Sequence, residues 1–296
     1  MMVLLLACVG APQDALTWRE GVELLGVIGG QGVIDARITV GNTGTLRGQA
    51  RMRVDRWSAQ GDPILFSQHA APQQVIRTAD GITMMEDGLS LVDGLWGLRV
   101  VDETLNGRIE VQPAGEHRPE TAWLEDERQW TVAAEVPMGR LSGWLSAGER
   151  GGAVRGVGVV LHRGGDGVPA LPRTAAFVLD ERVNIGIDRH GAGVLRWAII
   201  DGQSVPVDDL TVDLSAAHPT LTLPSANLQI TLHPWRWDGW SNPMDHLMGI
   251  EALLGGVVLG RPMRRVRAAR AEIVLRGESL SGPAILLDVM PASQVP

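Results

Sequence analysis

Several kinds of residue are missing from this sequence or nearly so. The chain of 296 residues contains no lysine and no tyrosine, and only one cysteine and two phenylalanines. Without lysine it cannot form a phosphate-binding P-loop, in which a lysine contacts the nucleotide phosphates. A single cysteine excludes an internal disulfide bond. No segment reaches the ~18 consecutive apolar residues that a membrane-spanning helix needs.

The charge balance argues against a nucleic-acid partner. The chain has 26 arginines against 34 acidic residues, which gives a formal net charge of −8. Binding to a phosphate backbone instead needs a concentrated basic surface. The one basic run, Arg264–Arg270, alternates arginines around Val266 as a solvated strand face would. We therefore expect no nucleic acid among the partners.

Motifs for two other kinds of chemistry are also missing. The sequence has no G-x-S-x-G segment, the motif that presents a nucleophilic serine on a tight turn. The histidines and aspartates between His233 and His246 lack the short, regular spacing of zinc ligands. We therefore expect no metal and no other cofactor.

What the sequence does contain is a period of two. In Val33–Val40, polar and apolar residues alternate as on a half-buried strand, and Gln49–Val54 repeats the pattern, so the two segments predict a hairpin. Turn pairs such as Asn106-Gly107 and Asp201-Gly202 separate further short alternating runs. Turns spaced this closely indicate an all-β sandwich or barrel.

One short helix is expected near the C-terminus. Asn242 can cap it, Pro243 suits its first turn, and Gly255-Gly256 would end it. No other segment combines a cap, a start and a stop as clearly.

The length suits two domains of about 150 residues each. A pattern of Gly-x-(Leu/Val)-Arg-Gly occurs once in each half, at Gly44 and Gly152, and the segment 112–128 is rich in proline and charge. We therefore expect two consecutive β domains with a boundary near Pro137. The predicted parts are 1–15 as signal and linker, 16–136 as the N-terminal domain and 137–296 as the C-terminal domain.

The N-terminus suggests a location in the cell. The start, MMVLLLACVGAP, has a short apolar run before Cys8 and resembles a bacterial lipobox, in which that cysteine becomes lipidated. This predicts a lipoprotein of the cell envelope that contacts the membrane through its lipid anchor only. The alternative is an ordinary apolar N-terminal strand, because the apolar run is shorter than the usual core of a signal peptide.

Arg155–Gly165, RGVGVVLHRGG, resembles a motif of the lipocalin-like carotenoid hydratases, the hydroxyneurosporene synthase-like family, whose relatives include natural-product cyclases. The resemblance implies two tandem lipocalin-like β domains and chemistry on polyene-type substrates. The matching residues are Gly156, Gly158, His162 and Gly165. The family's tyrosine, acid and aromatic positions are held here by Val159, Leu161 and Gly164. Near the end, Leu275 and Gly277 resemble the closing strand, with Val274 replacing its acid.

His162 is the candidate catalytic residue. It ends an apolar run and lies on the motif, so it could be oriented for proton transfer at the mouth of a ligand site. The alternative is a strand-end histidine that is satisfied by backbone or water.

The segment His233–His246, HPWRWDGWSNPMDH, contains three tryptophans. Two of them are two residues apart and so project to one strand face. They could form a wall for an apolar ligand with the methionine-bearing helix as a lid, or they could pack that helix onto the sheet. The candidate ligand-binding residues are Trp144, Trp197, Trp235, Trp237, Trp240, Met244 and Met248.

These observations leave three functions open. The first is an exported β protein that binds a small hydrophobic molecule, isoprenoid- or lipid-like. The second is a hydratase, cyclase or isomerase that acts on an apolar polyene-type substrate. The third is an envelope lipoprotein that only contacts other proteins, which predicts filled barrels and an exposed apolar patch.

Overall fold

The computed structural model describes most of the chain between Arg19 and Gln294. The described ranges are 19–29, 32–43, 46–58, 61–78, 81–84, 87–92, 95–115, 122–124, 130–148, 150–165, 172–191, 193–235, 241 and 262–294. Nearly all of these residues belong to strands, and the only helical pieces among them are three-residue 3-10 turns. The all-β prediction is confirmed. The predicted helix that starts at Asn242 lies outside the described residues.

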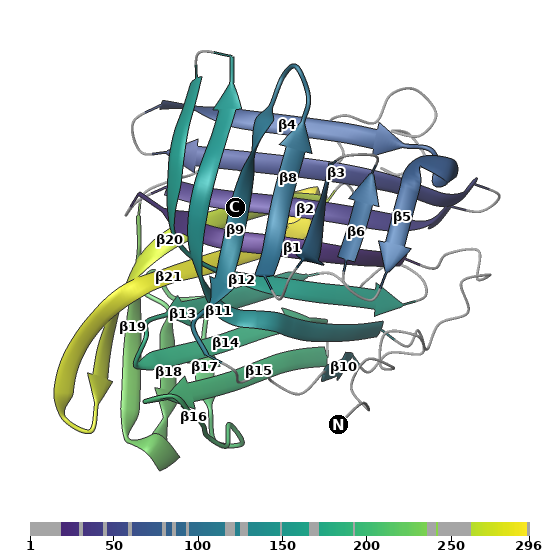
Figure 1. Ribbon diagram of the computed structural model, residues 1–296. Coiled ribbons are helices and arrows are strands. Elements are labelled where there is room, and N and C mark those ends of the chain that lie inside the picture. The colour runs from purple at the N-terminus through teal and green to yellow at the C-terminus, as the bar shows by residue number, and fades with distance from the viewer. Residues whose placement is uncertain are drawn as a thin grey trace. The chain divides into compact units, whose positions relative to one another are not determined.

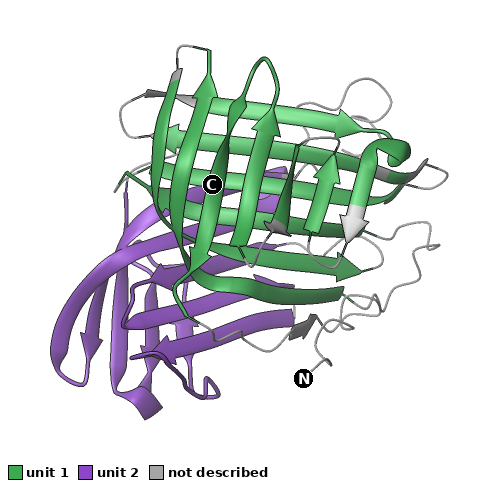
Figure 2. Ribbon diagram, viewed as in Figure 1, with its two compact units in different colours: residues 1–167 green, residues 168–296 purple. Residues whose placement is uncertain are grey.

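The chain divides into two compact units, residues 1–167 (unit 1) and 168–296 (unit 2), shown in separate colours in Figure 2. The boundary predicted near Pro137 falls inside strand β11 (Trp130–Ala147). That strand pairs with β9 (Asn106–Pro113) and β12 (Arg150–Gly165), both of which are in unit 1. The chain therefore leaves unit 1 only after β12, because these long paired strands complete its sheet.

Unit 1 is one antiparallel sheet with the order β4-β3-β2-β1-β12-β11-β9-β8-β7-β6-β5, and β10 pairs with β11. The remaining strands are β1 (Arg19–Ile28), β2 (Gly32–Thr43), β3 (Leu46–Ser58), β4 (Gly61–Ala70), β5 (Val75–Thr78), β6 (Gly81–Met84), β7 (Asp87–Val92), β8 (Leu95–Val101) and β10 (Ala122–Leu124), and a 3-10 turn spans Pro72–Gln74.

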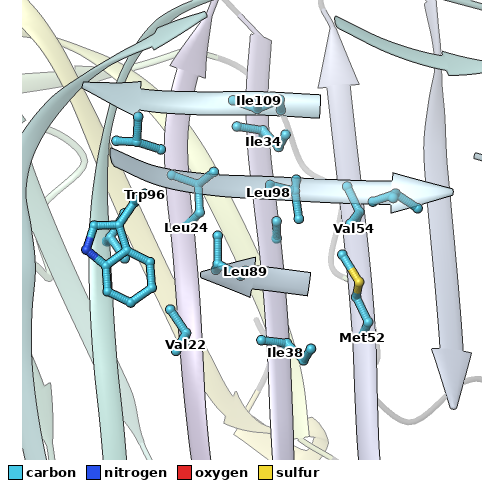
Figure 3. Close-up of a cluster of buried hydrophobic side chains, with 14 of the residues drawn as sticks. Val22, Leu24, Ile34, Ile38, Met52, Val54, Leu89, Trp96, Leu98 and Ile109 are labelled. Atoms are coloured by element: carbon cyan, nitrogen blue, oxygen red, sulfur yellow. The ribbon is translucent and has the colours of Figure 1, made fainter. Parts of the chain in front are cut away.

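The sheet of unit 1 curls over itself. Figure 1 shows β1 to β4 running across the unit and β5, β6, β8 and β9 crossing them, and β6 packs against β1 and β2. A hydrophobic core fills the space between the two layers (Figure 3). We call the face that carries this core the interior face of unit 1.

The predicted hairpin is confirmed, since β2 and β3 pair antiparallel and Ala36 and Ile38 lie in the core. Part of the opposite, polar face of this hairpin is also buried. Asp35 and Asp55 face each other there with no exposed surface, and Arg53 Nε lies 2.7 Å from Asp55 Oδ2. Burial raises the pKa of Asp55, Asp35 raises it further, and Arg37 and Arg53 oppose the shift.

Unit 2 is a second antiparallel sheet, with the order β16-β15-β14-β13-β21-β20-β19-β18-β17 and a hydrophobic core of its own. Its strands are β13 (Arg173–Leu179), β14 (Val183–His190), β15 (Gly193–Ile200), β16 (Gln203–Ser204), β17 (Thr211–Asp213), β18 (Thr220–Leu223), β19 (Leu228–Pro234), β20 (Pro262–Leu275) and β21 (Glu278–Pro291), with 3-10 turns at Pro224–Ala226 and Ala292–Gln294. In the described part of the chain, no helix is long and apolar enough to cross a membrane.

One predicted turn is confirmed and another is wrong. Asp201-Gly202 joins β15 to β16 with φ of 49° and 78°, the positive values that a two-residue hairpin turn requires. Asn106-Gly107 instead begins strand β9. A Cβ on Gly107 would lie 2.2 Å from the carbonyl oxygen of Trp144 on β11, so glycine is needed there for the close approach of two strands.

Candidate functional site

His162 lies near the end of β12 on the interior face of unit 1. It pairs in register with Val22 of β1 and Ala133 of β11, and its neighbour on the same strand face, Val160, belongs to the core. His162 is 4% exposed. The sequence indicated a histidine at the end of an apolar strand, and the structure places it against the apolar interior.

Glu20 holds one side of the imidazole. It lies two residues before Val22, so its side chain shares the interior face. Its Oε1 is 2.8 Å from His162 Nε2, and both side chains are almost fully buried. A buried carboxylate at this distance fixes the ring orientation and favours a proton on Nε2.

Glu135 approaches the other ring nitrogen. Its Oε1 lies 3.8 Å from His162 Nδ1, and its side chain is 20% exposed, which makes it the most accessible of the three. The pairing of β11 with β12 shifts register between Ala134 and Val136. Such a bulge turns two consecutive side chains to one face, and here Val136 enters the core while Glu135 reaches His162.

The three side chains form what we call the Glu–His–Glu cluster: Glu20, Glu135 and His162. An imidazole between two carboxylates can take a proton at one nitrogen and release one at the other. Glu20 is placed to orient the ring, and Glu135 lies at the other ring nitrogen and is the more exposed of the two carboxylates. The arrangement therefore suits general acid–base chemistry in apolar surroundings.

Another buried acid on the interior face, Asp87, has a structural role. Its Oδ1 accepts the backbone N–H of Val101, and its carboxylate accepts a hydrogen bond from Gln68 of β4. Burial raises the pKa of Asp87, and these two hydrogen bonds oppose the shift. Because Gln68 is on β4 and Asp87 on β7, the contact ties the two layers of unit 1 together.

The candidate tryptophans that the structure describes lie on or next to different strands, one in unit 1 and two in unit 2. Trp144 lies on β11 of unit 1 and is 48% exposed. Trp197 lies on β15 of unit 2, is buried, donates its indole N–H to Asn184 Oδ1 at 2.7 Å and stacks on Phe177. Trp235 follows β19, and its backbone N–H bonds to Ala268.

Trp197 is held by packing. Its partner across the ladder is Gly186, where a Cβ would lie 2.1 Å from the indole ring. Because Gly186 has no side chain, the Trp197 ring can lie flat on the sheet at this position. The remaining candidates, Trp237, Trp240, Met244, Met248 and the lipidation candidate Cys8, lie outside the described residues.

A second buried charged cluster lies in unit 2. Arg173 donates two hydrogen bonds to Asp188, from Nε at 2.8 Å and from a terminal nitrogen at 2.7 Å. His190 Nε2 is 3.0 Å from Asp188 Oδ1. Burial pushes the pKa of Asp188 upward, but Arg173 and His190 outweigh it and hold this pKa below its ordinary value.

The alternation of arginines in the basic run predicted a solvated strand face, and this prediction is wrong. Arg265 and Arg267 both bond to Asp288 of β21 and are each 18% exposed, and Arg264 is buried. Alternation shows which side chains share a face, but an acid on the neighbouring strand determined their surroundings.

Sequence reasoning missed Glu20 and Glu135. A signal for Glu20 was present, since β1 reads REGVELLGVI and, after its first arginine, carries two acids among apolar residues. Glu135 had no such signal, because a bulge cannot be recognised from alternation alone. The distance of 142 residues between Glu20 and His162 also hides their contact.

The comparisons with known proteins identify the fold. No family model matches the chain, and no curated protein is similar to it in sequence. Solved structures do resemble it. An AttH-type protein from Nitrosomonas europaea has a TM-score of 0.62 and 10% identity, covering 96% of this chain and 95% of its own.

Two further structures agree. Kievitone hydratase from Nectria haematococca has a TM-score of 0.59 at 9% identity, covering 97% of this chain and 92% of its own. CghA with bound Sch210972 has a TM-score of 0.60 at 10% identity, covering 93% and 88%. At such low identity these likenesses show the fold alone, which is lipocalin-like, in agreement with the fold that the sequence predicted.

Proposed function

We propose that the protein is an acid–base enzyme that hydrates, cyclises or isomerises a small, largely apolar molecule in unit 1. The observation that carries this proposal is the Glu–His–Glu cluster, which lies next to the hydrophobic core of unit 1. A protein that only stores a hydrocarbon has no need for three ionisable groups there, because each costs free energy to bury. The fold shared with a hydratase is consistent with the proposal.

In the proposed reaction, Glu135 is the proton donor. Its carboxyl proton adds to one carbon of a substrate double bond, which leaves a carbocation on the other carbon and a carboxylate on Glu135. Water then adds to the cation and gives up one proton to His162, which passes it to the carboxylate of Glu135, and the product is an alcohol. Alternatively, the cation gives a different proton to His162, which passes it to Glu135 in the same way, and the product is an isomer. Glu20 holds His162 in place for this transfer.

Incubation in D₂O tests this proposal. The purified protein is mixed with geraniol, farnesol, squalene or lycopene, and products are analysed by mass spectrometry. Each proposed reaction protonates a carbon, so we expect deuterium in the product of at least one of these alkenes. Binding without deuterium incorporation would favour a carrier of hydrophobic molecules. Neither binding nor incorporation would favour a lipoprotein that contacts only other proteins.

We further propose that the chain is exported and anchored in the cell envelope through a lipid on Cys8, as the start of the sequence suggests. In bacteria fed radiolabelled palmitate, the full-length protein should carry label and sediment with membranes. Cys8→Ser should lose the label and move the protein to the soluble fraction. An unlabelled, soluble wild-type protein would contradict the anchor.

A further inference from the structure

Trp96 is a buried tryptophan on the interior face of unit 1. It lies on β8, is 2% exposed and belongs to the same core as Val22, Leu24 and Val160. Figure 3 draws its indole ring in the same hydrophobic cluster as Val22 and Leu24 of β1. Val22, a member of the same core cluster, is the register partner of His162, which connects this core to the Glu–His–Glu cluster.

The indole N–H of Trp96 has no hydrogen-bond partner among the described residues, although the nitrogen is fully buried. Buried tryptophan N–H groups usually find an acceptor, because an unpaired donor loses its hydration without compensation. Trp197 in unit 2 illustrates the usual situation, since its N–H bonds to Asn184. The N–H of Trp96, by contrast, has no such acceptor among the described residues.

The direction of this N–H points to a ligand. In Figure 3 the nitrogen is on the side of the ring away from Leu89. On that side β1 is followed in the sheet by β12, which carries His162. The core cluster to which Trp96 belongs is hydrophobic, and none of the described residues accepts a hydrogen bond from this nitrogen. An oxygen supplied by a bound molecule would therefore satisfy the donor next to the candidate acid–base groups.

We infer that Trp96 donates a hydrogen bond to a carbonyl or hydroxyl oxygen of the substrate. The substrate class is then an apolar molecule with one oxygen acceptor placed near its reacting carbons, rather than a pure hydrocarbon. This inference rests on the proposed function in placing the substrate on the interior face of unit 1. It adds a residue that selects the ligand by its oxygen and positions the double bond relative to Glu135.

Two probes of equal shape test the hydrogen bond: 2-undecanone and 2-methyl-1-undecene, in which a methylene group replaces the carbonyl oxygen. Their dissociation constants are measured by native mass spectrometry for the wild type and for Trp96→Phe, which keeps the ring and removes the N–H. We expect the ratio of ketone to alkene affinity to fall about fivefold in the variant, the worth of one net hydrogen bond. Comparing ratios cancels the different water solubilities of the probes.

A second measurement uses only the wild-type protein, so its result does not depend on whether a variant folds. In ¹H–¹⁵N spectra of the wild-type protein, the indole signal of Trp96 should move downfield when 2-undecanone binds and stay near its free position with 2-methyl-1-undecene. The signal of Trp197 serves as the control, since its N–H is already bonded and should not respond to either probe. An unchanged affinity ratio in Trp96→Phe, an unmoved Trp96 signal, or failure of both probes to bind would each overturn the inference.

The outcome can be separated from that of the proposed function. If the preference for the ketone depends on Trp96 but no alkene takes up deuterium, then the inferred ligand class is supported and the proposed enzyme function is wrong. If deuterium is incorporated and the Trp96 signal does not respond, then the proposed enzyme function is supported and the role inferred for Trp96 is wrong.

Discussion

Replacing Glu135 or His162 with glutamine should lower the rate of deuterium incorporation from D₂O by about a hundred- to ten-thousand-fold, the usual contribution of one general acid–base group. Glu135→Gln removes the proton that the substrate receives. His162→Gln removes the group that returns it, while the amide can still donate to Glu20 in place of Nε2. Initial rates with the best alkene of the D₂O assay, at saturating concentration, are the measurement.

The role of Glu20 should be distinguishable from a merely structural one. Glu20→Gln leaves His162 and Glu135 in place and keeps an oxygen that can accept a hydrogen bond from Nε2, so we expect a smaller loss of rate than in the other two variants. His218→Gln, at an exposed histidine in unit 2, is the matched control and should not change the rate. If the glutamine variants lose activity only in proportion to the protein that unfolds, the cluster is structural.

Replacing Asp188 with asparagine should destabilise unit 2 by about 3–5 kcal/mol, the usual cost of removing one partner from a buried ion pair. Asp188 has no exposed surface, and it accepts both hydrogen bonds of Arg173 and contacts His190. Asparagine would leave the guanidinium buried without a counter-charge. Equilibrium unfolding in urea, followed by circular dichroism, measures the difference in free energy of unfolding.

The pH dependence gives a second check. Because the pKa of Asp188 is held below its ordinary value in the folded protein, its stabilising contribution is complete above the unfolded pKa of about 3.9 and is lost as pH falls further. Asp188→Asn should weaken this acid dependence. The raised pKa values of Asp55 and Asp87 act in the opposite direction, since ionising these groups costs stability as pH rises.

Asp201→Asn is the control for burial. Its carboxylate also bonds to an arginine, with Arg182 Nε at 3.0 Å, but both side chains are largely in solvent. Water screens such a pair, so this variant should unfold at nearly the same urea concentration as the wild type. Equal losses from Asp188→Asn and Asp201→Asn would contradict the role assigned to burial.

The charged face of strand β2 shows the limit of prediction from sequence. Alternation in β2 correctly separated Ala36 and Ile38 from Asp35 and Arg37. It could not show that Asp35 is buried as well. A period of two tells which side chains share a face, but what packs on that face depends on strands that are distant in sequence.

The sequence alone determined the fold class, the β2–β3 hairpin and the Asp201-Gly202 turn, because each follows from local backbone preference. It also singled out His162 as a candidate through a short motif. The tertiary structure alone decided which groups meet at His162. Glu20 arrives through the pairing of β1 with β12, and Glu135 through a bulge in β11. Strand pairing between distant segments and a one-residue shift of register leave no local pattern, so only the folded sheet brings the two carboxylates to one imidazole.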